Sequence, residues 1–401
     1  MRLAIFYFDL LHYHVARCAA LIKLAQAEDH KVFVYSMRPK SPDLPIVGYQ
    51  DRISDNVRIL LPNDQISLNS KVAANAIISA LEHDMPDAVA IPGYRTRLCM
   101  AALTWCRRNA RTAILLSESR REDYRRFWWK EQLKRLIVSQ FDSAVVGGTP
   151  QAKYAAELGI PIDRIFLGYD VVDNEFWAER TETVRNDPSH WRNLMGLPGR
   201  YFLAVGRFIP KKNFEGLIRA YARYHNTVGE RAWRLVICGT GPLEGKLRNL
   251  VIELEQQEYI YFVGYMDAEQ LSKIYGLAST FVHASAYAEQ WGLVVNEAMA
   301  AGLPVLVSRT VGCVHDLVRE GVNGYTFDPL DIERLAQLLA QVSSASSDKL
   351  VEMGTASKAI IADWSPERFA RSILQAAEVG RDSALRKANL WWIRVFPFLP
   401  L

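Results

Sequence analysis

The chain has 401 residues, of which 50% are hydrophobic and 23% are charged. This composition provides enough apolar surface for a buried core, which excludes a disordered or low-complexity chain. A single core rarely grows to this length, so two domains of roughly 150–200 residues are expected. The formal net charge of +4 gives no reason to expect a nucleic-acid partner.

The five cysteines, Cys18, Cys99, Cys106, Cys238 and Cys313, are scattered and lack metal-binding spacing. This pattern is typical of buried thiols in a reducing cytosol. The first residues read as a strand and not as a signal peptide, because Asp9 and His12 interrupt the apolar run. No stretch reaches the ~18 uninterrupted apolar residues that a membrane span needs. The sequence therefore predicts a cytoplasmic protein that at most lies on a membrane surface.

Short apolar runs alternate with helical patterns through the first half of the chain. In the segment 14–28, apolar residues recur at helical spacing, which predicts a helix. Strands are predicted at 2–8, 31–36, 57–61, 87–91, 112–117 and 142–147. Strands that are apolar on both sides and alternate with helices predict a parallel sheet covered on both faces.

The alternation stops around 184–200, where two prolines, two glycines and mixed charge suggest a linker. It then resumes, with strands predicted at 201–206, 234–238, 259–263, 279–284, 304–308 and 324–327. Residues from 331 to about 393 read as helix. Two doubly wound α/β domains are therefore expected, and such sheets bind ligands at the carboxyl ends of their strands.

The first candidate site is the segment 206–213, which lies between a predicted strand and a predicted helix. Arg207 offers a planar fork suited to phosphate oxygens, and Lys212 adds a positive charge five residues later. The start of a helix also attracts anions. This pattern favours a phosphate site, with a solvated basic turn as the alternative.

The second candidate site contains two carboxylates, Glu289 before a predicted helix and Glu297 inside it. The N–H groups near Gly292, Leu293 and Val294 at the start of that helix would accept an anion between them. Carboxylates accept hydrogen bonds from sugar or ribose hydroxyls, which indicates a ligand that carries both hydroxyls and an anion. A helix-dipole role for one Glu and a surface position for the other is the alternative.

Other motifs support or exclude classes of site. Gly239 opens a tight turn after one strand, and Val263, Gly264 and Tyr265 end another, where a flat ring could lie against backbone. The chain lacks GxGxxG after its first strand, GxxxxGK[ST], GxSxG and a DxD pair. A nucleotide-sugar enzyme without a DxD metal site would neutralise its leaving diphosphate with protein charge.

Together these residues resemble the family-four (group 1) retaining glycosyltransferases of GT-B fold. The resemblance rests on Gly206-Arg207 followed by Lys212, on Glu289 and Glu297 as a Glu-x7-Glu motif, and on the GTGP turn and 321–327. It is specific across about 200–330 and weaker over the first domain, where 166–177 looks like the closing segment of such domains.

The resemblance implies two Rossmann-like domains facing across a cleft. Residues 1–185 would form an acceptor-side domain, 186–370 a nucleotide-sugar donor domain, and 371–401 a tail packing on the first domain or on a membrane. It implies catalytic roles for Arg207, Lys212, Glu289 and Glu118. It also implies donor contacts from Arg207, Lys212, Gly239, Val263, Gly264, Tyr265, Glu289, Trp291, Gly292, Leu293, Val294 and Glu297, with no metal and no other cofactor.

The first domain departs from the family pattern. No glycine follows the first strand, where the chain has Asp9, His12 and His14 instead. Glu118 stands where many members have a histidine. These four residues are the candidates for contact with the acceptor.

The resemblance predicts transfer of a hexose, with retention, from a nucleoside-diphosphate sugar to a saccharide or lipid-linked acceptor, as in polysaccharide or glycoconjugate synthesis. A sugar-nucleotide epimerase or phosphorylase, or a non-catalytic nucleotide-sugar binder, are the alternatives. Residues 120–135 are basic and contain Phe127, Trp128 and Trp129. Such a segment can make peripheral contact with the anionic inner face of the cell membrane, with a solvated face over buried tryptophans as a strong alternative.

Overall fold

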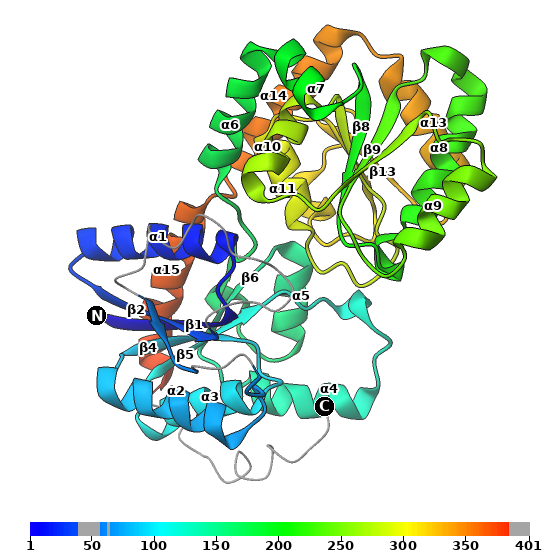
Figure 1. Cartoon of the computed structure of the whole chain (residues 1–401). Coiled ribbons are helices and arrows are strands. Elements are labelled where there is room, and N and C mark those ends of the chain that lie inside the picture. Colours follow the sequence, from blue (N-terminus) through cyan, green and yellow to red (C-terminus); the bar gives the residue numbers. More distant parts are fainter. Residues whose placement is uncertain (39–56, 62–64, 385–401) are drawn as a thin grey trace. The chain divides into compact units, whose positions relative to one another are not determined.

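The computed structural model describes residues 1–38, 57–61 and 65–384, and the side chains of 382–384 are outside that description. The chain divides into two compact units (Figure 1). The first unit combines Met1–Val172 with the segment from Trp364 onward, and the second is the continuous segment Asp173–Asp363. The chain therefore leaves the first unit once and returns to it.

The first unit contains a parallel sheet in the order β3-β2-β1-β4-β5-β6-β7. Its strands are β1 (Arg2–Asp9), β2 (Lys31–Arg38), β3 (Val57–Ile59), β4 (Ala88–Pro92), β5 (Thr112–Ser117), β6 (Ser143–Val146) and β7 (Ile165–Leu167). The first six confirm the predicted strands to within a few residues, whereas β7 was not predicted. The central strands are buried along nearly their whole length, as a sheet covered on both faces requires.

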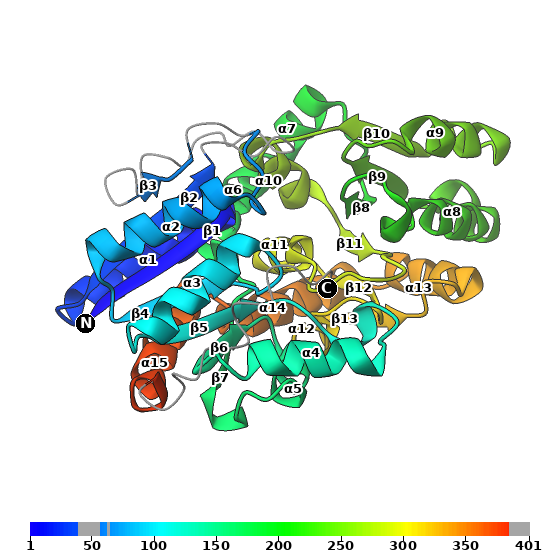
Figure 2. The same cartoon turned by 90° about the horizontal axis from the view of Figure 1, so that it is seen from below.

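Helices cover both faces of this sheet (Figures 1 and 2). They are α1 (His12–Ala27), α2 (Lys71–Asp84), α3 (Arg97–Arg108), α4 (Trp128–Val138), α5 (Thr149–Glu157) and α15 (Pro366–Ala384). Helix α1 confirms the helix predicted at 14–28 and packs against α15, while α2 packs against α3. Two serines tie α15 to the sheet: Ser143 Oγ donates to Ala376 O and Ser372 Oγ donates to Leu167 O, both at 2.7 Å.

The second unit contains a parallel sheet in the order β10-β9-β8-β11-β12-β13. Its strands are β8 (Tyr201–Val205), β9 (Arg234–Cys238), β10 (Ile260–Gly264), β11 (Thr280–His283), β12 (Val305–Ser308) and β13 (Gly324–Phe327), and each matches a predicted strand. Counted from its first strand, the order is 3-2-1-4-5-6, which is that of doubly wound dinucleotide-binding sheets. The predicted fold class is confirmed in both units.

The helices of the second unit also lie on both faces of its sheet. They are α6 (Asn174–Asn186), α7 (Pro188–Met195), α8 (Phe214–Val228), α9 (Glu244–Glu253), α10 (Ala268–Leu277), α11 (Leu293–Ala300), α12 (Val314–Leu317), α13 (Ile332–Ser343) and α14 (Ser347–Ala362). Helix α8 packs against α13, and α6 packs against α10.

The linker predicted at 184–200 is wrong, because this segment holds the end of α6 and all of α7. Pro188 is the first residue of α7, the Asp187 side chain accepts a hydrogen bond from His190 N at 3.1 Å, and Gly196 ends the helix in the left-handed conformation. These residue types also start and stop helices. The passage between units instead follows Val172.

The helical reading of 331–393 is correct in part. Helices α13, α14 and α15 fill it as far as Ala384, with short breaks between them, and 385–393 lie outside the described residues. All five cysteines are buried and none forms a disulfide with a described residue, as predicted. Over the described residues, no helix combines the length and apolarity that crossing a bilayer requires.

Candidate active site

Three loops meet at the carboxyl ends of neighbouring strands in the second unit. Backbone hydrogen bonds join them: Gly206 N donates to Cys238 O at 3.0 Å, Phe208 N to Thr240 O at 2.8 Å, and Gly239 N to Gly264 O at 2.8 Å. A Cβ atom on Gly239 would lie 2.0 Å from Gly206 O, so no larger residue fits this close approach. The loops that follow β8, β9 and β10 therefore form one rigid rim.

Glu289, in the loop between β11 and α11, is the centre of a cluster of polar side chains. Its Oε2 atom accepts hydrogen bonds from Lys212 Nζ at 2.6 Å and from Ser285 Oγ at 3.0 Å. Lys211 Nζ lies 3.7 Å and His283 Nε2 3.9 Å from the same oxygen. The structure thus brings together Lys212 and Glu289, which were predicted separately from two motifs.

The charges in this cluster are strongly coupled. Burial alone raises the pKa of Glu289, but the positive charges of Lys212 and Lys211 outweigh it and hold that pKa at about 2. Burial, Lys211 and Arg207 lower the pKa of Lys212, and Glu289 opposes them. We conclude that Glu289 is ionised and that Lys212, paired with it at 2.6 Å, stays protonated at neutral pH.

His283 is neutral, because burial and the charge of Lys212 lower its pKa to about 3. The ionised Glu289 can only accept, so the Ser285 hydroxyl donates to it. Ser285 Oγ also lies 3.2 Å from His283 Nε2, which must then be the donor to the hydroxyl oxygen. This chain of two hydrogen bonds fixes the orientation of the carboxylate.

The cluster carries an excess of positive charge. Arg207 is exposed and makes no side-chain hydrogen bond or ion pair with the residues that the structure describes. Three cations (Arg207, Lys211 and Lys212) and one carboxylate (Glu289) leave a formal charge of +2. This positive charge can compensate the negative charge of a diphosphate that is bound through two or more of its oxygens.

The N-terminus of α11 lies beside this cluster. Gly292 caps the helix with φ +97°, and a Cβ atom on it would lie 3.0 Å from Val311 Cγ1 and 3.5 Å from His283 Nε2. Leu293 and Val294 follow as the first helical residues, and both are half-buried. Because the first N–H groups of a helix have no acceptor within it, this end can bind an anion.

Glu297 lies one turn further along α11 and has a different environment. Its Oε2 atom accepts a hydrogen bond from the Tyr275 hydroxyl at 3.0 Å. The Tyr275 ring is in turn held edge-on by Trp177, with 5.4 Å between ring centroids. Burial and the charge of Glu297 raise the pKa of Tyr275 well above its usual range, so the phenol remains a donor.

The other predicted donor residues divide into exposed and internal positions. Val263 and Gly264 are half-buried at the end of β10, and Tyr265 after them is 46% exposed. The Trp291 side chain is only 2% exposed and donates to Asn296 Oδ1 at 2.9 Å. Trp291 therefore supports the loop from inside the unit.

The candidates of the first unit follow β1 and β5. Asp9 forms an ion pair with Arg38 at 3.2 Å, and His12 lies edge-on to Tyr13. His14 stacks on Tyr7 at 4.1 Å, and burial lowers its pKa well below the usual range. His14 is therefore neutral.

Glu118 is hydrogen-bonded to Asp170, a buried residue that sequence reasoning missed. Burial raises the pKa of Asp170 well above its usual range, and the charge of Glu118 raises it further. The positive charge of Arg17 opposes both effects. Arg17 Nη2 lies 3.8 Å from Asp170 Oδ1.

Comparison with known proteins covers the second unit best. Residues 188–378 match the family model described as "Glycosyl transferases group 1". This segment is similar to the group 1 glycosyltransferases. The D-inositol 3-phosphate glycosyltransferase of Nocardia farcinica is 31% identical over 252 residues, which are 61% of this chain and 54% of that protein. The chain spans about half the length of the curated relatives it matches.

Solved structures match both units. A glycosyltransferase from Rickettsia africae has a TM-score of 0.72 at 14% identity, covering 96% of this chain and 98% of its own. An Anabaena protein in complex with UDP has a TM-score of 0.70 at 14% identity, covering 94% and 100%. At such identities the likeness shows the fold alone, and it confirms the predicted GT-B fold.

The group 1 match contains every donor-side candidate from Arg207 to Glu297 and none of the four first-unit candidates. Sequence reasoning missed Lys211, Tyr275, His283 and Ser285 in the second unit. Lys211 stands beside Lys212 and could have been included on that ground. His283 lies in a predicted strand and Ser285 directly follows it, whereas nothing in the sequence singles out Tyr275.

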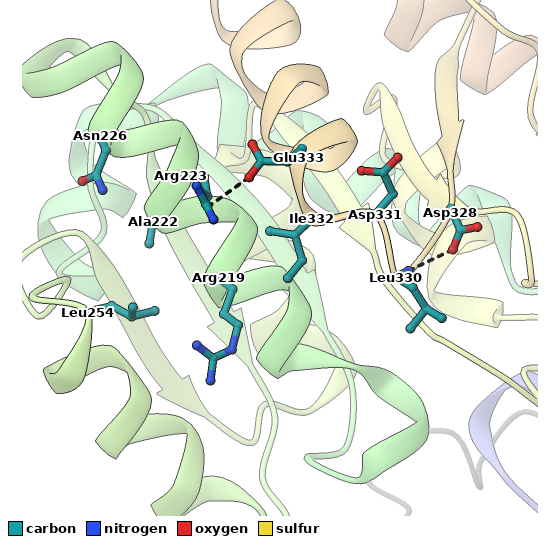
Figure 3. Close-up of a pocket in the computed structure, with 10 residues that line it drawn as sticks. All are labelled: Arg219, Ala222, Arg223, Asn226, Leu254, Asp328, Leu330, Asp331, Ile332 and Glu333. Atoms are coloured by element: carbon teal, nitrogen blue, oxygen red, sulfur yellow. Dashed lines mark hydrogen bonds and ion pairs between the residues drawn. The ribbon is translucent and has the colours of Figure 1, made fainter.

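A pocket of about 820 Å³ lies elsewhere in this unit, between α8 and the start of α13 (Figure 3). None of the predicted site residues lines it. Its charged side chains are largely paired: Arg223 contacts Glu333 at 3.1 Å and Arg219 contacts Glu215 at 3.3 Å. This pairing leaves little unbalanced charge for an ionic ligand.

Proposed function

We propose that this chain is a group 1 glycosyltransferase that transfers a hexose, with retention, from a nucleoside-diphosphate sugar to a saccharide or lipid-linked acceptor. The observation that carries the proposal is the excess charge of +2 around Glu289, beside the N-terminus of α11. A diphosphate that leaves a sugar needs such stabilisation in the transition state more than in the ground state.

In the proposed reaction, the bond between sugar C1 and the diphosphate oxygen breaks while a bond from C1 to the acceptor oxygen forms on the same face. The acceptor's proton passes to the departing phosphate. Arg207, Lys211 and Lys212 stabilise the negative charge that grows on that phosphate. Because these side chains already match the charge of a diphosphate, we propose that transfer needs no divalent metal and no other cofactor.

The two carboxylates would hold hydroxyl groups. Glu289 uses Oε2 for its contacts with Lys212 and Ser285, and its Oε1 accepts no hydrogen bond from the described residues. We propose that Oε1 accepts from a hydroxyl of the transferred sugar. Glu297, oriented by Tyr275, would accept from the ribose, and the backbone of Val263–Tyr265 would face the base.

On the acceptor side, the proposal assigns Glu118 to an acceptor hydroxyl, with Asp170 as its hydrogen-bonded partner. A lipid-linked acceptor is supported by the aromatic side chains around the start of α4. Phe127, Trp128 and Trp129 are 49%, 78% and 45% exposed, and the Lys130 ammonium lies 5.3 Å from the ring centre of Trp129. Exposed tryptophans among cations suit a bilayer interface, so we propose a cytoplasmic enzyme that docks on the inner membrane face.

The test is a transfer assay with UDP-, GDP- and ADP-sugars, with and without a saccharide acceptor and with and without a chelator. Lys212→Ala and Glu297→Ala should each lower transfer at least a hundredfold while the melting temperature changes little. Arg223→Ala, a paired residue remote from the site, is the matched control. Full transfer by both site variants would refute the assignment, and conversion of donor without an acceptor would favour an epimerase or phosphorylase.

A further inference from the structure

A second cavity lies at the opposite edge of the same sheet. Its volume is about 490 Å³. Arg200, Ser279 and Pro304 line it, and they directly precede β8, β11 and β12. We call it the amino-edge cavity. Strand β8 has five residues, so roughly 17 Å of strand separates this cavity from the Glu289 cluster.

The charge on this cavity is one-sided. Four cations line it, Arg185, Arg192, Arg200 and Lys358, and no aspartate or glutamate is among its lining residues. Helices α6, α7 and α14 contribute three of them (Figure 1). This arrangement contrasts with the pocket between α8 and α13, where the arginines have carboxylate partners.

Two of the four cations are held by neutral groups. Arg185 donates to Ala301 O at 2.6 Å and to Gly276 O at 3.2 Å, and Arg200 donates to Ser347 Oγ at 2.8 Å. Burial lowers the pKa of Arg185, although the charge of Glu182, which does not line the cavity, opposes this. These contacts fix the side chains but leave their charge unbalanced.

The other two cations have no such partners. Arg192 makes no side-chain hydrogen bond or ion pair with the described residues, and its Nε is buried without an acceptor. Lys358 likewise has no ion pair among them. A buried donor without an acceptor is rare in folded proteins and needs an explanation. A bound anion would supply the missing acceptor and the missing negative charge.

We propose that the amino-edge cavity binds a small phosphomonoester, of the size of a hexose phosphate. Its volume falls in the range of small-molecule sites. Arg192 and Lys358 would contact the phosphate, because cations with free donors favour oxyanions. Ser279, Ser347 and Thr355 also line the cavity, and their hydroxyls suit a phosphomonoester whose remaining part is polar, such as a sugar.

The experiment measures binding of glucose 6-phosphate and inorganic phosphate to the full chain by calorimetry, with glucose as the uncharged control. The Lys212→Ala variant removes a cation from the Glu289 cluster and should keep this binding. Arg192→Ala and Lys358→Ala should each weaken it at least tenfold, whereas Arg192→Lys should retain most of it. Arg223→Ala is the matched control and should bind as the wild type does.

Three outcomes would overturn the proposal. They are no binding to the wild type, unchanged binding in both Arg192→Ala and Lys358→Ala, and loss of binding in Lys212→Ala alone, which would move the ligand to the Glu289 cluster. Because transfer activity is measured separately, failure here leaves the proposed function standing.

Discussion

Neutralising Lys212 and neutralising Glu289 should change the affinity for a diphosphate in opposite directions. Lys212→Met removes a cation from the cluster and lowers its formal charge from +2 to +1. Glu289→Gln removes the carboxylate and raises that charge to +3. Both side chains are largely buried, with 14% and 10% exposed. We expect the first change to weaken, and the second to strengthen, binding of a free nucleoside diphosphate.

The size of each effect follows from distances. The phosphorus of a phosphate that contacts Lys212 would lie about 4 Å from the Lys212 charge and roughly 6 Å from that of Glu289. At an effective dielectric constant of about 20, these separations correspond to about 4 and about 3 kcal/mol. Salt screening and relaxation reduce both. We therefore expect Lys212→Met to weaken binding about 30-fold, or about 2 kcal/mol, and Glu289→Gln to strengthen it about fivefold, or about 1 kcal/mol.

The assay is calorimetric titration at low salt with UDP, GDP and ADP, repeated at higher salt, where both differences should shrink. Glu289→Gln should also reduce sugar transfer, although it binds the diphosphate more tightly. Weaker binding by both variants, or no change in either, would show that the cluster does not hold the diphosphate by charge.

Two further predictions concern stability. The pKa of the buried His283 is about 3 in the folded state against about 6.5 in the unfolded chain. The unfolded chain therefore takes up a proton first as pH falls, and stability is lost between about pH 6.5 and 3. His283→Gln should reduce the difference in unfolding free energy between pH 7 and pH 4, measured by urea unfolding, by on the order of 3 kcal/mol. His190→Gln, at an exposed position, should leave that difference unchanged. Equal differences in the wild type and both variants would contradict this reasoning. Gly239→Ala places a methyl 2.0 Å from Gly206 O and should lower the free energy of unfolding, measured by thermal unfolding, by roughly 3 kcal/mol. In the control Gly245→Ala the methyl meets no atom within 4 Å, so stability should be unchanged or should rise by about 0.5 kcal/mol. A Gly239→Ala variant that melts like the wild type would disprove the close contact.

Local patterns in the sequence were enough to predict most of the fold. Buried strands such as β8 and β9 are short apolar runs, and these runs locate the strands to within a residue or two. Strand β7 is an apolar run of only three residues, all half-buried, so it was missed. Pro188 and Gly196 were assigned to a linker because the same residues that break a chain pattern also begin and end helices.

The candidate site was predictable only residue by residue. Arg207, Lys212, Glu289 and Glu297 stand in recognisable motifs, but the contact between Lys212 and Glu289 joins positions 77 residues apart. The support that Tyr275 gives Glu297 depends on how α10 packs near α11, which no short segment encodes. The raised pKa of Asp170 beside Glu118 depends on burial, which composition does not reveal.

The return of α15 to the first unit has a consequence for biosynthesis. Translation produces the strands of the first sheet long before the helix whose Ala376 and Ser372 cover β6 and β7. Until Pro366–Ala384 leaves the ribosome, β5, β6 and β7 lack this helix on one face, while Asp173–Asp363 is already complete as an uninterrupted segment. The second unit should therefore complete its fold before the first unit does. The first unit should be the one that needs protection until α15 has been synthesised.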